Sequence, residues 1–133
     1  MGFFNWDTTL DVGVDAMNDQ HQLLIGLMNR LHDRHTAGAD HEELAKIFQD
    51  LAEYTVHHFA REEAYMESVA FPGRESHHRI HADLLGKLAT HHDAFKQGEP
   101  LGEQLFRFLA FWLAAHIRGV DTKYGQHAKK HAA

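Results

Sequence analysis

Residues 41–70, HEELAKIFQDLAEYTVHHFAREEAYMESVA, lie within the longest stretch of the chain that contains neither glycine nor proline. Apolar residues recur in it every three or four positions, which predicts one helix with a single face turned to a core. That face contains Leu44, Ile47, Phe48, Leu51, Tyr65, Met66 and Val69. Because Thr55, His58 and Glu62 fall on the same face, this helix is expected to carry polar side chains into the interior.

Three further helices are expected around this one, at residues 18–37, 74–97 and 101–119. The segments that separate them are short and contain Gly38, Pro72-Gly73 and Gly98-Glu99-Pro100. Connections this short make successive helices antiparallel. The predicted fold class is therefore all-α, an up-down-up-down antiparallel four-helix bundle.

The remaining residues at the two ends of the chain are expected to flank the bundle, and the whole chain to form a single domain. Residues 1–17 are interpreted as an N-terminal arm, residues 18–121 as the bundle and residues 122–133 as a C-terminal tail. A chain of 133 residues can bury one core but not two. The function must then be carried by the bundle itself.

Composition excludes several classes of function. The net charge of −6 argues against nucleic acid, which requires a basic surface. The most apolar stretch, residues 105–117, contains Arg107 and is shorter than a membrane span, and no leader peptide is recognisable. A cytoplasmic monomer is expected. The absence of cysteine means that any metal must be held by nitrogen and oxygen.

Six residues of ligand type are predicted to point inward: His21, His58, Glu62, His77, His81 and His116. Burying an ionised carboxylate such as Glu62 without a partner would cost several kcal/mol or more. A cation would offset that charge and use the imidazole lone pairs. Counted from the turns at about 1.5 Å per residue, all four helices present ligands at nearly one height in the bundle. A metal centre is therefore expected there.

The other histidines of the chain are interpreted as surface residues. With 14 histidines, a His-x-x-x-His pair is expected about once by chance, so a pair alone is weak evidence. His127 and His131 form such a pair in the lysine-rich tail, where solvent exposure is expected. His57 and His78 are offset by about 100° from the predicted ligands beside them. His32, His35, His41, His91 and His92 are also assigned to the surface.

Asp121 is ambiguous on spacing alone. It follows His116 by five residues, so in a regular helix the two side chains would point about 140° apart. Both could reach one centre if the helix ends or widens between them, and Gly119 would permit that. The alternative is a solvated aspartate just past the helix.

The complete residue pattern resembles the hemerythrins, and among them the single-domain bacteriohemerythrins. The pattern comprises, in order, His21, His58-Phe59-x-x-Glu62-Glu63, His77-x-x-x-His81 and His116-x-x-x-x-Asp121. The resemblance spans essentially the whole chain, including the aromatic arm at Phe3, Phe4 and Trp6 and the turn at residues 71–73.

The resemblance implies two iron ions, Fe2+ or Fe3+, bridged by Glu62, Asp121 and an oxo or hydroxo group. His77, His81 and His116 would complete one iron, and His21 and His58 would hold the other. The second iron would have one ligand fewer, leaving a position for dioxygen. By the same resemblance Trp112, Leu113 and Ile117 line the oxygen pocket, although they would also serve as ordinary core residues.

The implied function is reversible dioxygen binding, for carriage, storage or delivery to an oxygen-consuming enzyme, rather than catalysis. One alternative is a di-iron oxidase or peroxidase of the ferritin-like class. That class uses paired Glu-x-x-His motifs on two helices, and this chain contains no such pair. The other alternative is oxygen or redox sensing, or iron handling, on the same fold.

Overall fold

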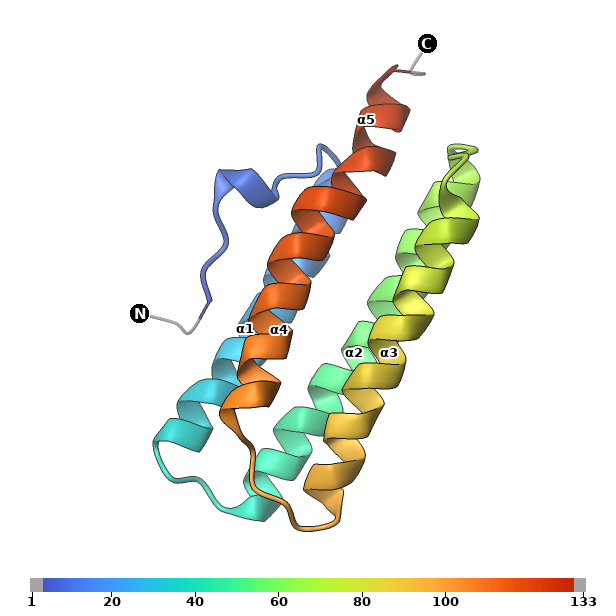
Figure 1. Cartoon of the computed structure of the whole chain (residues 1–133). Coiled ribbons are helices and arrows are strands. Elements are labelled where there is room, and N and C mark those ends of the chain that lie inside the picture. Colours follow the sequence, from blue (N-terminus) through green and yellow to red (C-terminus); the bar gives the residue numbers. More distant parts are fainter. Residues whose placement is uncertain (1–3, 131–133) are drawn as a thin grey trace.

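Four long helices make up most of the computed structural model, which describes residues 4–130. They are α1 (Asp15–Thr36), α2 (His41–Ser68), α3 (Arg74–Lys96) and α4 (Glu103–His116). Successive helices run in opposite directions along a common axis (Figure 1). The predicted antiparallel four-helix bundle is confirmed, and the first three helices end within two residues of the predicted positions.

Local chemistry explains where the helices begin and end. At the start of α2, the Asp40 carboxylate accepts a hydrogen bond from the Glu43 backbone N–H at 2.9 Å, which satisfies one of the unpaired donors of the first turn. The turns after α1 and α3 pass through Gly38 and Gly98, with φ of 84° and 102°. Only glycine adopts this left-handed conformation without strain, so both helices stop there.

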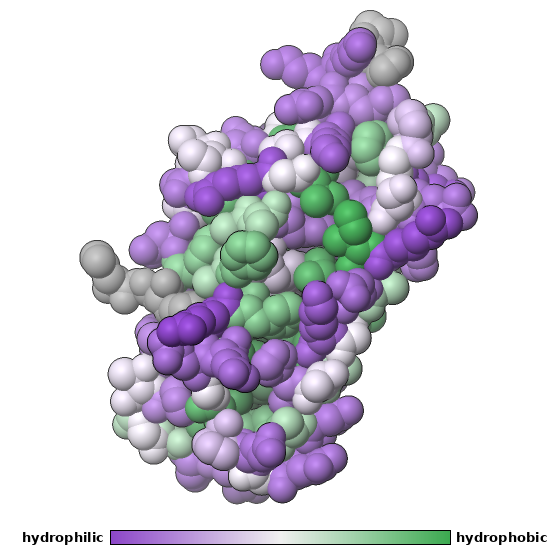
Figure 2. Space-filling model, in the orientation of Figure 1, coloured by the Kyte–Doolittle hydropathy of each residue, from purple (hydrophilic) through white to green (hydrophobic). Residues whose placement is uncertain are grey.

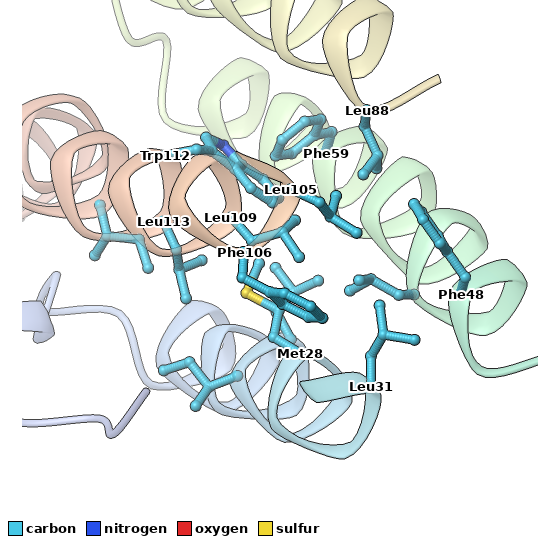
Figure 3. Close-up of a cluster of buried hydrophobic side chains, with 14 of the residues drawn as sticks. Met28, Leu31, Phe48, Phe59, Leu88, Leu105, Phe106, Leu109, Trp112 and Leu113 are labelled. Atoms are coloured by element: carbon cyan, nitrogen blue, oxygen red, sulfur yellow. The ribbon is translucent and has the colours of Figure 1, made fainter. Parts of the chain in front are cut away.

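The core lies between the four helices and continues away from the polar centre toward the turns after α1 and α3. Met28 and Leu31 of α1, Phe48 of α2 and Leu109 of α4 are completely buried. Figure 3 shows these side chains meeting in the interior of the bundle. Ile80 of α3 lies outside this core and is 38% exposed.

Residues 122–130 are helical and partly buried, so the prediction of a solvated tail is wrong for them. After α4 the chain forms one π-helical turn, η2 (Ile117–Asp121), and continues as α5 (Thr122–Lys130) along the axis of α4 (Figure 1). Tyr124 and Gly125 are buried. His127 is half-buried, and its Nε2 lies 3.0 Å from the backbone carbonyl oxygen of Val69. His131 lies outside the described residues.

The N-terminal arm is shorter than predicted because α1 begins at Asp15. It contains a 3-10 turn, η1 (Thr8–Leu10), and packs on the bundle through the buried side chains of Leu10 and Val12. Phe3, part of the expected aromatic arm, lies outside the described residues. No helix in residues 4–130 is long and apolar enough to cross a membrane.

Candidate metal centre

Five buried side chains from four segments form the first group of possible metal ligands. His77 and His81 come from α3, His116 from the end of α4, Glu62 from α2 and Asp121 from η2, and their ligand atoms lie within 4.8 Å of one another. The Nε2 atoms of His77 and His116 are each 2.9 Å from Asp121 Oδ1. His81 Nε2 is 3.0 Å from Glu62 Oε1.

A second group lies beside the first and shares its carboxylates. It comprises His21 of α1, His58 of α2 and Glu62, with ligand atoms again within 4.8 Å of one another. Glu62 Oε2 is 3.2 Å from His21 Nε2 and 3.4 Å from His58 Nε2. Asp121 Oδ2 is 3.1 Å from His21 Nε2. Each carboxylate therefore presents one oxygen to the first group and the other oxygen to the second.

The π-helical turn brings Asp121 into the centre. In a regular α-helix, the spacing of five residues would point Asp121 away from His116. The wider turn over Ile117–Asp121 instead brings Asp121 Oδ1 to 2.9 Å from His116 Nε2. Of the two alternatives left open by the spacing, the structure has the one in which the helix widens, and Asp121 is buried rather than solvated. Gly119 is not required for it, because its backbone is not left-handed and an added Cβ would meet nothing within 4 Å.

The polar atoms of both groups are better placed to bind metal ions than to form hydrogen bonds with one another. Glu62 Oε1 and both oxygens of Asp121 are buried and make no hydrogen bond in the described part of the chain, because their approaches to the imidazole nitrogens lack hydrogen-bond geometry. Atoms about 2.1 Å from a common ion, at right angles to one another, lie about 3.0 Å apart. The contacts of 2.9–3.4 Å described above are close to that separation. The side chains thus fit two metal ions bridged by two carboxylates.

The same side chains strongly affect one another's charge. Burial would raise the pKa of Glu62, but the facing nitrogens of His21, His58 and His81 outweigh it and hold that pKa well below its usual range. Burial and the charge of Glu62 would raise the pKa of Asp121, yet His116 and His21 lower it to about 2. Burial opposes protonation of His21, but Asp121 and Glu62 raise its pKa to about 9. Both carboxylates are therefore ionised and require positive charge beside them.

Comparison with known proteins places this centre in a family. Residues 12–128 match the hemerythrin HHE cation binding domain. The chain belongs to the hemerythrin family. A bacteriohemerythrin of Stenotrophomonas maltophilia is 31% identical over 98% of this chain and 85% of its own length. A myohemerythrin of Riftia pachyptila is 32% identical, over 90% of this chain and 88% of its own.

Solved structures agree with the fold described above. A crystal structure of wild-type hemerythrin superposes with a TM-score of 0.86 at 30% identity, covering 92% of this chain and 95% of the other. The resemblance inferred from the seven-residue pattern is confirmed by these matches. All seven predicted residues, from His21 to Asp121, meet at one place in this hemerythrin bundle.

The outer nitrogens of two imidazoles are held by acceptors on neighbouring turns. His58 Nδ1 donates to the Gln20 amide oxygen at 2.7 Å. His81 Nδ1 pairs with Glu63 Oε2 at 2.9 Å, and His78 Nδ1 pairs with the other oxygen of Glu63 at 2.5 Å. Bonds of this kind fix the tautomer that leaves Nε2 available for a metal ion. The side chain of Glu63 is only 25% exposed, and it contributes to the site through these two histidines.

The remaining histidines lie outside both groups of ligands. His57 and His78 are exposed, as predicted. Four others expected on the surface are half-buried, because their rings lie against aromatic side chains: His32 and His35 on Phe106, His91 on Phe108 and His92 on Phe48. The single Glu-x-x-His match in the sequence is Glu75 with His78, and both side chains are exposed, so neither belongs to the two groups of ligands.

One residue at the centre was missed by the sequence reasoning. Tyr124 of α5 is completely buried, and its hydroxyl donates a 2.6 Å hydrogen bond to Glu62 Oε2. Burial, reinforced by the charge of Glu62, raises the pKa of Tyr124 far above its usual value, so the hydroxyl stays protonated. A signal was available, because Ile117, Asp121 and Tyr124 follow one another at helical spacing and continue the pattern past residue 119, the predicted helix end.

The predicted oxygen pocket consists of buried apolar side chains on α4 and η2. Trp112, Leu113 and Ile117 are 4%, 2% and 1% exposed, and the Trp112 ring meets that of Phe59 edge to face at 5.9 Å. Trp112 and His116 also line a surface groove of about 250 Å³ between α3 and α4. Figure 2 shows apolar surface gathered over these two helices.

Proposed function

We propose that this hemerythrin-family protein binds dioxygen reversibly at a non-haem di-iron centre and acts as an oxygen carrier or store. The observation that carries the proposal is the division of the two carboxylates: one oxygen of Glu62 and one of Asp121 face each group of histidines. Two metal ions side by side, joined by two bridges, account for that arrangement.

The ligand assignment follows from these contacts. His77, His81 and His116 would hold one iron, and His21 and His58 the other, with Glu62 and Asp121 bridging both. The side with two histidines has one protein donor fewer, which leaves a position for a small ligand. Five neutral imidazoles and only two carboxylates suit reversible binding better than a carboxylate-rich cage does.

The chemistry of the proposed reaction needs little from the protein beyond positioning and exclusion of water. A pair of ferrous ions supplies the two electrons that dioxygen takes up on binding and returns on release. Gln20 and Glu63 orient His58 and His81 through their Nδ1 atoms. Trp112, Leu113 and Ile117 keep the interior dry, which protects the bound ligand from proton delivery by bulk water.

We propose carriage rather than catalysis, by a cytoplasmic monomer that stores dioxygen or delivers it to an oxygen-consuming enzyme. The chain lacks the paired Glu-x-x-His motifs of ferritin-like oxidases. The dry interior described above favours retention of the bound ligand over its chemical use.

Metal analysis and an absorption spectrum test the proposal. Protein reconstituted anaerobically with ferrous iron should hold two irons per chain, develop a visible band in air and lose it on degassing with recovery of dioxygen. Fewer than one iron per chain would refute the di-iron centre. Failure to return dioxygen, with catalytic turnover of a reductant and peroxide, would favour the oxidase or peroxidase reading instead.

A further inference from the structure

Tyr124 occupies an unusual place beside the metal centre. Its hydroxyl donates to Glu62 Oε2, the same oxygen that faces His21 and His58. The terminal torsion of a glutamate side chain is broad and roughly two-fold, so a carboxylate can rotate unless something holds one oxygen. The tyrosine hydrogen bond holds Oε2 on the side of the second group and leaves Oε1 toward His81.

The ring of Tyr124 is held independently of its hydroxyl. It lies 5.8 Å from the His77 ring and 5.6 Å from the Tyr65 ring, centroid to centroid. Tyr65 is only half-buried, and its hydroxyl makes no hydrogen bond to Glu62 in the described part of the chain. Removing the hydroxyl from Tyr124 should therefore leave the aromatic packing in place and affect only the hydrogen bond to Glu62.

The position of Tyr124 depends in turn on contact between the N-terminal arm and α5. A Cβ added to Gly125, the next residue, would lie 1.7 Å from the carbonyl oxygen of Val12, so the two backbones touch directly. An added Cβ on Gly119, in the preceding turn, meets nothing within 4 Å. Only glycine at position 125 allows the arm to lie this close to the tyrosine.

The arm is itself fixed to α1 next to a predicted ligand. The Val12 N–H donates to the side-chain oxygen of Asn18 at 3.0 Å, and the Asn18 amide donates to Asp11 at 2.8 Å. Asn18 is buried on α1, one turn before His21. The arm therefore connects the helix that carries His21 to the helix that carries Tyr124.

We infer that Tyr124 is a positioning residue, whose hydroxyl fixes Glu62 between the two groups of histidines, and that the arm holds Tyr124 in place through the contact between Val12 and Gly125. The inference rests on the proposed function only in that Glu62 is taken to bind metal. It predicts that the arm and α5 contribute to metal binding although neither supplies a ligand. Their effect reaches the metal through Glu62 of α2.

Cobalt(II) is a suitable probe, because its visible absorption reports the arrangement of its ligands. Tyr124→Phe should still load two cobalt ions, but with a shifted spectrum and about 10- to 100-fold weaker binding in competition with a chelator. Tyr65→Phe, which removes a hydroxyl from the neighbouring ring, should match wild type in both. A purely structural role would lower the melting temperature and leave the cobalt spectrum unchanged.

The outcomes separate this inference from the proposed function. Wild-type protein that loads fewer than two cobalt ions would count against the di-iron centre itself. Wild type that loads two, together with a Tyr124→Phe variant of identical spectrum and affinity, would overturn the positioning role alone. The same holds if Tyr124→Phe fails to fold, since the ring packing was taken to be independent of the hydroxyl.

A second pair of variants tests the arm. Gly125→Ala should weaken cobalt binding and shift the spectrum in the same direction as Tyr124→Phe, whereas Gly119→Ala should not. If the arm acts through the tyrosine, the double variant Tyr124→Phe/Gly125→Ala loses no more affinity than the weaker-binding single variant. Losses that multiply in the double variant would show that the arm acts by another route.

Discussion

Glu62 touches groups from four segments of the chain. Its carboxylate faces His21 of α1, His58 of α2, His81 of α3 and the hydroxyl of Tyr124 in α5. A buried charge in this position is stabilised by these partners, together with the cation they imply. The residue therefore links the stability of the bundle to its ability to bind metal.

Glu62→Ala should abolish metal binding and destabilise the fold, by about 3 to 5 kcal/mol, because it leaves several buried polar groups without their partner. Glu67→Ala, on the same helix but 72% exposed at its side chain, is the matched control and should change stability by only a few tenths of a kcal/mol. Iron content and melting temperature measure both effects. Equal values in the two variants would contradict the assignment of Glu62 as a bridge.

Glu63→Gln tests the outer hydrogen bond to His81. The carboxylate accepts from His81 and from His78, and its pKa is lowered because these two imidazoles outweigh the effect of its partial burial. An amide keeps the shape but loses the charge, so metal affinity should fall about 10-fold or more while the fold is retained. Chelator competition against Glu53→Gln, an exposed control on the same helix, provides the measurement. Unchanged affinity would mean that Glu63 does not tune His81.

At the scale of helices, the three- and four-residue spacing of apolar residues predicted the structure well wherever a regular helix buries one face. It predicted α1 to α3 closely, and it turned six ligand-type residues inward: His21, His58, Glu62, His77, His81 and His116. These residues follow from geometry that is uniform along a helix. Asp121 could be placed only as one of two alternatives, because its position depends on a local widening of the helix that spacing permits but does not require.

What the pattern could not predict depends on contacts between segments distant in sequence. Residues 122–130 are rich in polar side chains, and only their packing against the arm and Glu62 makes Tyr124 and Gly125 interior residues. Likewise, Glu63 lies beside the buried face of α2 and becomes part of the site because His81 of α3 approaches it. A single helical face carries no information about such neighbours.

Leu113→Ala tests the apolar wall of α4. Leu113 lies one turn before His116 and is 2% exposed, so truncation should cost about 2 to 5 kcal/mol of stability and leave a cavity. Because the cavity adjoins polar groups of the centre, water can enter it. The oxygenated absorption band should then decay faster, while iron content stays normal.

The control for this wall is Leu23→Ala, at a side chain 57% exposed on α1. It should leave both stability and the decay of the oxygenated band unchanged within experimental scatter. A Leu113→Ala protein with the same decay rate as wild type would show that water exclusion by α4 does not limit the lifetime of the bound ligand.

At the scale of the whole molecule, the buried charges make stability depend on pH in the absence of metal. The pKa values of Glu62 and Asp121 are lowered, so their contribution is present above about pH 4, the unfolded value, and is lost as pH falls through the folded values. The pKa of His21 is raised to about 9, so its contribution is complete below about pH 6.5 and is lost as pH rises through 9. In chelator-treated protein, the combined contribution of these three groups to the free energy of unfolding should be largest between about pH 4 and 6.5.

Metal binding should therefore release a proton from His21. In the metal-free protein at pH 7 the imidazole is protonated, because its pKa is about 9, whereas a metal ligand must be neutral. Adding cobalt(II) in weak buffer with a pH indicator should release about one proton more at pH 7 than above pH 9.5. His21→Asn, which lacks the titrating group, should abolish that difference. If wild type and His21→Asn release the same number of protons at pH 7, His21 is already neutral, and the carboxylates must obtain their compensating charge from another group before metal arrives.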